Sequence, residues 1–292
     1  MAIPIGFEHI TREQELLAPF TWFRLGGKAQ YFAEPTSVAE LQGLVRQAAK
    51  DGLAVRILGG GSNLLVRDEG VSGLVIHLSA AAFGTIAIQG KKVVAGGGAK
   101  LGHVISTAVR EGLAGLEQLV GIPGTLGGAL HTNAGSHSAD IGQWTQSATV
   151  MTRKGDIVTR KREELRFGYR DSSLDELVVL EATLELEKGD AAKLTKHMQQ
   201  LWILKRASQP LGAEGAGCIF KNFGGVSAAS LIEEAGLKGA RIGDAEICDR
   251  SPNFVLAGPR AKSRDVLELV EHVRKVVAEK TGTELEIAIE VW

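Results

Sequence analysis

The chain has 292 residues, of which 44% are hydrophobic and 23% charged, as is usual for globular proteins. Its 33 Lys and Arg are balanced by 34 Asp and Glu, and a net charge of −1 argues against general nucleic-acid binding, which needs a basic excess. No apolar stretch could span a membrane and the start lacks a signal-peptide pattern, so we expect a cytoplasmic protein with no membrane partner. Cys218 and Cys248 show no metal or redox spacing, which indicates a reducing compartment and predicts no metal site.

The first half of the chain contains both helix and strand signals. Ser37 followed by Glu40 is a capping-box pattern, and apolar residues then recur at helical spacing until a glycine stops the helix. Strands over 147–152 and 156–159 flank Lys154-Gly155, a sequence typical of a hairpin turn. The other expected elements are strands over 54–58, 74–78, 85–88 and 93–95 and a helix over 101–111.

The second half begins with a long strand over 178–187 and a helix over 191–205, and we place a domain boundary near residue 190. This helix carries four large apolar residues on one predicted face: Leu194, Met198, Leu201 and Trp202. The remaining expected elements are a short helix over 228–235, a longer helix after Ser263 and a closing strand over 285–292. Strands and helices occur in separate runs, which predicts the α+β class.

Glycine is about twice as frequent as usual, with 37 residues, some of which form three clusters. The first cluster belongs to the segment Gly59, Gly60, Gly61, Ser62 and Asn63. Successive N–H groups of such a turn can hold phosphate oxygens, and a plain strand-ending turn is the alternative interpretation. Leu64 breaks the GxGxxG pattern and no GK[ST] follows, so a Rossmann dehydrogenase and a P-loop kinase are both disfavoured.

A second glycine-rich segment lies downstream of a further cluster at 96–98. Its candidate cofactor-binding residues are Gly121, Ile122, Pro123, Gly124, Thr125, Asn133 and Gly135. A Pro-Gly pair fixes a turn, and glycines without a Cβ let the backbone approach a ligand closely. Together the two segments predict a diphosphate cofactor held across loops.

Five short motifs follow one another along the chain. They are Phe23-Arg24-Leu25-Gly26-Gly27, Leu58 to Leu65, Gly121 to Thr125, Phe167-Gly168-Tyr169-Arg170-Asp171-Ser172 and Phe220-Lys221-Asn222. From about residue 16 to the end, the chain closely resembles the UDP-N-acetylenolpyruvoylglucosamine reductase family. It resembles the shorter form of that family, because no inserted loop with a tyrosine follows Phe223.

The resemblance implies an α+β fold with an FAD-binding domain of the vanillyl-alcohol-oxidase (PCMH) type over 1–190 and a smaller α+β substrate-binding domain over 191–292. It implies FAD as cofactor, NADPH as hydride source and a small-molecule UDP-sugar substrate, whose enolpyruvyl double bond is reduced to give UDP-N-acetylmuramate for peptidoglycan. We expect a monomer. An FAD-dependent oxidase and a flavin- or UDP-sugar-binding paralogue without catalysis stay open as alternatives.

The resemblance also assigns roles to individual residues. Arg170 matches an arginine that stabilises the enolate, for which a planar, permanently charged guanidinium is suited, although an ordinary surface ion pair is the alternative. Cys218 stands where the family usually has the serine that protonates the enolate carbon, and a thiol is more acidic than a hydroxyl. A buried structural cysteine is the alternative there. Arg206, Lys221 and Asn222 are expected to bind the substrate.

The family's C-terminal glutamate has no unique counterpart in this chain. Counting from Gly282 and Leu285 places Ala288 at that position, whereas counting from the Glu-Val dipeptide places Glu290 there. Residues 286, 288 and 290 would share one face of a strand, because side chains alternate. We therefore predict Glu290 as the catalytic carboxylate, with Glu286 as a second candidate and two solvent-facing charges as the alternative.

Overall fold

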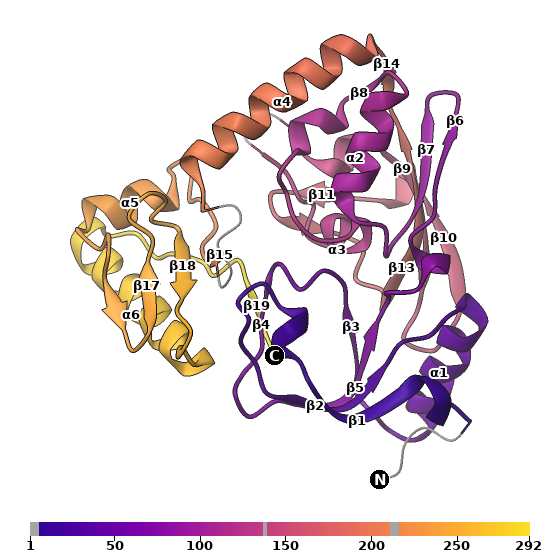
Figure 1. The fold of residues 1–292 in the computed structure, drawn as a ribbon, viewed down its shortest axis with the longest axis horizontal. Coiled ribbons are helices and arrows are strands. Elements are labelled where there is room, and N and C mark those ends of the chain that lie inside the picture. Colours follow the sequence, from indigo (N-terminus) through magenta and orange to yellow (C-terminus); the bar gives the residue numbers. More distant parts are fainter. Residues whose placement is uncertain (1–5, 137–138, 211–215) are drawn as a thin grey trace. The chain divides into compact units, whose positions relative to one another are not determined.

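The computed structural model describes residues 6–136, 139–210 and 216–292 (Figure 1). The chain forms two compact units, and the second unit includes two short segments from the first quarter of the sequence. The first unit comprises Met1–Glu15, Gln30–Gly60 and Ser72–Ile203, and the second comprises Leu16–Ala29, Gly61–Val71 and Leu204–Trp292. The functional division at residues 190 and 191 stays a prediction.

The first unit is built on two sheets, although a few residues at the ends of their strands belong to the second unit. Their strands are β1 (Thr11–Leu16), β2 (Lys28–Ala33), β3 (Val55–Leu58), β5 (Val71–His77), β6 (Ile86–Gln89), β7 (Lys92–Gly96), β9 (Thr145–Met151), β10 (Ile157–Lys161) and β13 (Val178–Glu185). One sheet has the order β1-β2-β5-β3 and the other the order β10-β9-β13-β7-β6. The latter is antiparallel, whereas β3 and β5 run parallel.

Helices α1 (Val38–Lys50), α2 (Leu101–Arg110) and α3 (Leu126–His131) belong to this unit, in which α4 (Ala191–Ser208) also begins. Figure 1 shows α2 and α3 beside the five-stranded sheet, and their apolar side chains form one core cluster with it. Side chains of α1 and the four-stranded sheet form another. Minor elements are β8 (Leu113–Ala114), β11 (Phe167–Gly168), β12 (Asp171–Ser172) and β14 (Glu187–Lys188), with 3-10 turns at Glu8–Ile10, Ala18–Phe20, Ala81–Phe83, Leu116–Leu119, Ile141–Trp144 and Arg162–Glu164.

The start of α1 confirms the predicted helix and refines its cap. Ser37 Oγ accepts a hydrogen bond from Glu40 N at 3.2 Å, as a capping residue should. The Glu40 carboxylate accepts from Thr36 N at 2.7 Å rather than from Ser37 N. The predicted hairpin is also present, and its turn is widened to three residues because Thr152 N bonds Asp156 O, with Gly155 left-handed at φ +80°.

The second unit contains one four-stranded sheet, of order β15-β18-β17-β16, and a separate parallel pair, β19 with β4. Its elements are β4 (Leu64–Leu65), β15 (Ala216–Cys218), α5 (Ala228–Glu234), β16 (Arg241–Ile242), β17 (Ala245–Ile247), β18 (Phe254–Ala257), α6 (Ser263–Thr281) and β19 (Glu290–Val291). The predicted stripe of α6 is buried, and Gly282 ends the helix at φ +69°. The stripe consists of Val266, Leu269, Val270, Val273 and Val277, each of which gains about 1.5–3 kcal/mol by burial.

Two sequence-based predictions need correction. The closing strand over 285–292 is interrupted, because Ile287 forms an isolated bridge with Phe220 and only Glu290–Val291 pairs with β4. The apolar face predicted for α4 is only partly covered. Leu194 and Met198 pack on the core of the first unit, but Trp202 is 40% exposed. Among the described residues, no helix is long and apolar enough to cross a bilayer.

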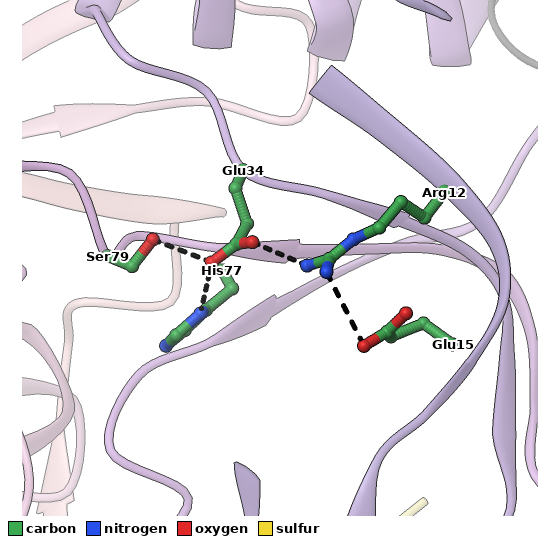
Figure 2. Close-up of polar contacts among 5 residues, drawn as sticks. All are labelled: Arg12, Glu15, Glu34, His77 and Ser79. Carbon is green, nitrogen blue, oxygen red and sulfur yellow. Dashed lines mark hydrogen bonds and ion pairs between the residues drawn. The ribbon is translucent and has the colours of Figure 1, made fainter. Parts of the chain in front are cut away.

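A polar cluster lies around Glu34, directly after β2, an inner strand of the four-stranded sheet (Figure 2). The Glu34 carboxylate accepts from Arg12 Nη2 at 2.5 Å, Ser79 Oγ at 2.7 Å and His77 Nδ1 at 3.1 Å. Burial alone would raise the pKa of Glu34, but hydrogen bonds from Ser79 and His77 and the charges of His77 and Arg12 outweigh it and lower that pKa. The ionised carboxylate therefore stabilises the fold.

We expect Glu34→Gln to lower the free energy of unfolding at neutral pH by up to about 1 kcal/mol, the upper range for a partly exposed pair. Because the folded-state pKa is depressed, the contribution is complete above the ordinary glutamate pKa and is lost as pH falls through the lowered value. Urea unfolding at neutral pH and at about pH 3 tests this. A difference between wild type and variant that does not change with pH would contradict it.

Candidate active site

The two glycine-rich segments meet in the first unit. A Cβ on Gly60 would lie 2.6 Å from Gly124 Cα, and one on Gly59 would lie 2.7 Å from Thr125 Oγ1. Their backbones therefore approach more closely than any residue with a side chain would allow. The structure brings together these parts of the two predicted cofactor loops. The rest of the second loop consists of Gly121, at φ +81°, Ile122 and Pro123.

The glycine cluster at 96–98 contacts the second of these loops. Gly127 N donates to Gly97 O at 2.8 Å, and Leu126 N donates to Ala99 O at 2.9 Å. Helix α3 starts here, with Thr125 Oγ1 accepting from Gly128 N at 3.4 Å. We did not predict α3, because it is only six residues long and contains two glycines, which weaken helical propensity. Its signal was Thr125 at the capping position.

Asn133 and Gly135 have structural contacts that the sequence did not reveal. The Asn133 side chain is 3% exposed, and it donates to Gly168 O at 2.7 Å and accepts from Gly142 N at 3.0 Å. A Cβ on Gly135 would lie 2.8 Å from Ala139 O. The Asn133 amide thus holds the segment that leads to Arg170, and a direct cofactor contact of either residue stays a prediction.

Arg170 occupies the turn between β11 and β12, where it has the left-handed φ of +56°. The hairpin is tied to the end of α3, because Ser172 Oγ donates to His131 O at 3.0 Å. Within the part of the chain that the structure describes, the exposed Arg170 guanidinium has no hydrogen-bond or ion-pair partner in the protein. A left-handed arginine costs about 1–2 kcal/mol, and such strain is common at functional sites.

Gly61, Ser62 and Asn63 belong to the second unit. Gly61 has φ +61°, and a Cβ there would lie 2.0 Å from Phe20 O. Asn63 Nδ2 donates to Ala288 O at 2.8 Å. The side-chain amide of Asn63, which belongs to the segment predicted to bind phosphate, therefore holds the C-terminal segment in this structure, and phosphate binding by Ser62 and Asn63 stays a prediction.

Cys218 lies half-buried at the end of β15, where it pairs with Phe254 of β18. The next residues are held by Asn253, which sequence reasoning did not identify. Asn253 O accepts from Ile219 N at 3.0 Å, and its side-chain amide bonds both the N–H and the carbonyl of Phe220. A polar residue in a Ser-Pro-Asn turn just before an apolar strand was the available signal.

The three predicted substrate-binding residues differ in their surroundings. Arg206 is exposed on α4. Lys221 Nζ lies 2.5 Å from Glu286 Oε1, with side-chain exposures of 24% and 71%. Asn222 Oδ1 accepts from Ala228 N at the start of α5. Lys221 is therefore already paired with a carboxylate that an anionic ligand would have to displace or share.

The C-terminal segment places its candidate carboxylates in different surroundings. Lys221 N donates to Glu286 O and Ala288 N donates to Ile219 O, so Ala288 lies opposite Ile219. Glu290 lies beyond this ladder, on β19, and its carboxylate accepts from Trp292 Nε1 at 2.9 Å. A catalytic role for Glu290 stays a prediction.

Family models match both halves of the chain. Residues 29–160 match a model described as FAD binding domain, and residues 209–292 match one described as UDP-N-acetylenolpyruvoylglucosamine reductase, C-terminal domain. A glucose dehydrogenase, Phl p 4.0202, has a TM-score of 0.50 at 13% identity over 63% of this chain and 42% of its own, which is a likeness of fold alone. The predicted fold class is confirmed.

Relatives extend over nearly the whole chain. A UDP-N-acetylenolpyruvoylglucosamine reductase from Rhodopirellula baltica is 39% identical over 289 residues, which is 99% of this chain and 95% of that protein. A second from Symbiobacterium thermophilum is 41% identical over 283 residues, 96% of this chain and 92% of that protein. The crystal structure of the Thermus caldophilus reductase has a TM-score of 0.83 at 36% identity, covering 97% of this chain and 99% of that one. The chain belongs to the family of UDP-N-acetylenolpyruvoylglucosamine reductases.

Proposed function

We propose that this protein is an enzyme that uses FAD and NADPH to reduce UDP-N-acetylenolpyruvoylglucosamine to UDP-N-acetylmuramate, a precursor of peptidoglycan. The near full-length similarity to reductases of that name carries the proposal. The proposal includes that the enzyme is cytoplasmic and monomeric. The test is NADPH oxidation that depends on the enolpyruvyl substrate and yields the lactyl ether. NADPH oxidation driven by oxygen alone would favour an oxidase, and none with either acceptor would favour a paralogue without catalysis.

The first unit contains residues that fit an FAD diphosphate. Gly59 and Gly60 lie too close to Thr125 and Gly124 to leave room for a Cβ, and backbone N–H groups in such glycine turns bind phosphate oxygens. These residues lie within the match to the FAD-binding model. When bound, FAD would supply the hydride chemistry, while the protein supplies position and electrostatics.

We expect Gly60→Ala to weaken FAD binding by about 10–100-fold, because its Cβ would overlap Gly124 Cα and relieving overpacking costs about 1–3 kcal/mol. Gly102→Ala on α2 is the matched control, since no atom lies within 4 Å of its added Cβ. The control should keep FAD affinity and gain up to about 1 kcal/mol of stability. Titration of each apoprotein with FAD measures the affinity, and urea unfolding measures the stability of the control. Unchanged affinity in Gly60→Ala would contradict a cofactor role for this loop.

The chemical roles proposed for the chain's own residues follow from their side chains. The Arg170 guanidinium holds the substrate carboxylate and stabilises the negative charge of the enolate formed by hydride addition. The Cys218 thiol donates the proton that converts the enolate carbon to the lactyl ether. Lys221, Asn222 and Arg206 bind the UDP-sugar, with Glu286 moving away from Lys221 or sharing it when the diphosphate arrives.

We expect Glu290→Gln to slow reduction of the enolpyruvyl substrate and to spare flavin reduction by NADPH, because a carboxyl group near the enolate acts only in the second half-reaction. Glu286→Gln should have a smaller effect, since its exposed pair with Lys221 is worth at most about 1 kcal/mol. Separate anaerobic measurements of the two half-reactions test this. If both variants behave as wild type, no C-terminal carboxylate is catalytic, and Ala288→Glu becomes the informative variant.

A further inference from the structure

The backbone next to Cys218 is held by a side-chain amide that acts like a neighbouring strand. Pairing of β15 with β18 ends at Cys218, and Asn253 stands immediately before β18. Asn253 Oδ1 accepts from Phe220 N at 2.9 Å, and Asn253 Nδ2 donates to Phe220 O at 2.8 Å. The amide thus makes the two hydrogen bonds that a residue of a neighbouring antiparallel strand would make with Phe220.

The C-terminal segment completes the pairing from another direction. Ile219 O accepts from Ala288 N at 2.7 Å, and Lys221 N donates to Glu286 O at 2.9 Å. Every backbone N–H and carbonyl of Ile219 and Phe220 therefore has a partner, since Ile219 N also bonds Asn253 O. Both residues are at most 3% exposed, and leaving one buried group unpaired costs about 1–3 kcal/mol. The short backbone between Cys218 and Lys221 is thereby confined to one arrangement.

We propose that Asn253 is a positioning residue, which fixes the backbone of Phe220 and through it the directions of the Cys218 and Lys221 side chains. The inference rests on the proposed function for its kinetic part, since it assumes that these two side chains meet the substrate. Asn253 itself is buried, with 9% exposure, and its side-chain oxygen and nitrogen both bond Phe220. It acts through the backbone and not by touching the reacting atoms.

Asparagine is the required residue because the backbone N–H of Phe220 needs an acceptor and its carbonyl needs a donor. In Asn253→Asp an ionised carboxylate can still accept from Phe220 N, but its second oxygen faces Phe220 O without a hydrogen. Protonation restores a donor at that oxygen, and burial favours the neutral acid. Lowering the pH should therefore restore the hydrogen bond to Phe220 O and the rate of Asn253→Asp. It would not restore a rate that was lost through poorer packing.

The test uses the full-length, FAD-loaded enzyme and follows each half-reaction anaerobically. At neutral pH, Asn253→Asp should slow reoxidation by UDP-N-acetylenolpyruvoylglucosamine by about 10²-fold, the effect of a small misplacement, and leave reduction by NADPH unchanged. The ratio of variant to wild-type rate should rise as pH falls, whereas Asn253→Ala should show no such recovery. Gln42→Glu is the matched control, because Gln42 Nε2 also bonds a backbone oxygen, Gly155 O at 2.7 Å. It should leave both half-reactions unchanged at every pH.

Equal slowing of both half-reactions, or a rate ratio for Asn253→Asp that does not change with pH, would overturn the proposal. Amide hydrogen exchange of the wild-type protein gives a readout independent of activity and of variant folding. The amides of Ile219 and Phe220 should exchange as slowly as those of the β17–β18 ladder, and rapid exchange there would also overturn it. If the wild-type flavin is not reoxidised by the substrate, the proposed function fails, while hydrogen exchange still decides whether Asn253 holds this segment.

Discussion

Cys218→Ala is expected to slow reoxidation of the NADPH-reduced flavin by UDP-N-acetylenolpyruvoylglucosamine by about 10²–10⁴-fold, the usual contribution of a positioned general acid. Flavin reduction by NADPH should be unchanged, because no proton from Cys218 enters that step. Cys218→Ser should retain more activity than Cys218→Ala, since a hydroxyl in the same place can still donate. Stopped-flow absorbance under anaerobic conditions measures the two half-reactions separately.

The matched control for this experiment is the second cysteine. Cys248 is 5% exposed, and its N–H bonds Phe254 O, so it has the surroundings of a packing residue. Cys248→Ala should cost stability, about 1 kcal/mol, and leave both half-reactions intact. Equal slowing of both half-reactions in Cys218→Ala would instead assign Cys218 the packing role that buried cysteines commonly have.

Arg170→Gly is expected to slow the same half-reaction by about 10²–10³-fold, the range observed when a donor to a developing oxyanion is removed. Its folding stability should not fall, because glycine adopts the left-handed conformation that Arg170 has at φ +56° without the cost an arginine bears. Arg170→Lys keeps the charge but loses the planar pair of donors, so it should recover only part of the rate. Thermal unfolding and the two half-reactions together measure these effects.

Gln14→Gly controls for the backbone change, since exposed Gln14 on β1 also has a left-handed φ, of +53°. It should match or exceed wild-type stability and keep both rates. A large loss of stability in Arg170→Gly, or slowing of NADPH oxidation equal to that of substrate reduction, would show that Arg170 serves the fold instead of the enolate.

Elements with a strong local pattern could be predicted from the sequence. The cap of α1 at Ser37 and the buried stripe of α6 are both present, because spacing and capping residues determine these features within the element itself. The closing strand was predicted as continuous, because apolar residues alternate throughout it. The structure interrupts it after Ile287, where its partner changes from the Phe220 segment to β4, and a change of partner leaves no local signal.

The candidate site shows the same division between local and long-range information. The clustering of glycines identified the two loops, which meet at Gly60 and Gly124. It assigned Asn63 and Asn133 to the cofactor, although their side chains bond the backbone of distant segments. Asn253 was not identified, because its partner Phe220 lies 33 residues away. The sequence does not show whether the side-chain amide of an asparagine bonds a ligand or the protein backbone. Only the tertiary structure distinguishes these two roles.

The visible spectrum of the purified protein tests the central claim most directly. The protein should be yellow with one noncovalent FAD per chain, and NADPH added under anaerobic conditions should bleach it. Addition of UDP-N-acetylenolpyruvoylglucosamine should then restore the yellow colour as UDP-N-acetylmuramate forms. A colourless protein that binds no added FAD, or a reduced flavin that this substrate leaves bleached, would contradict the account.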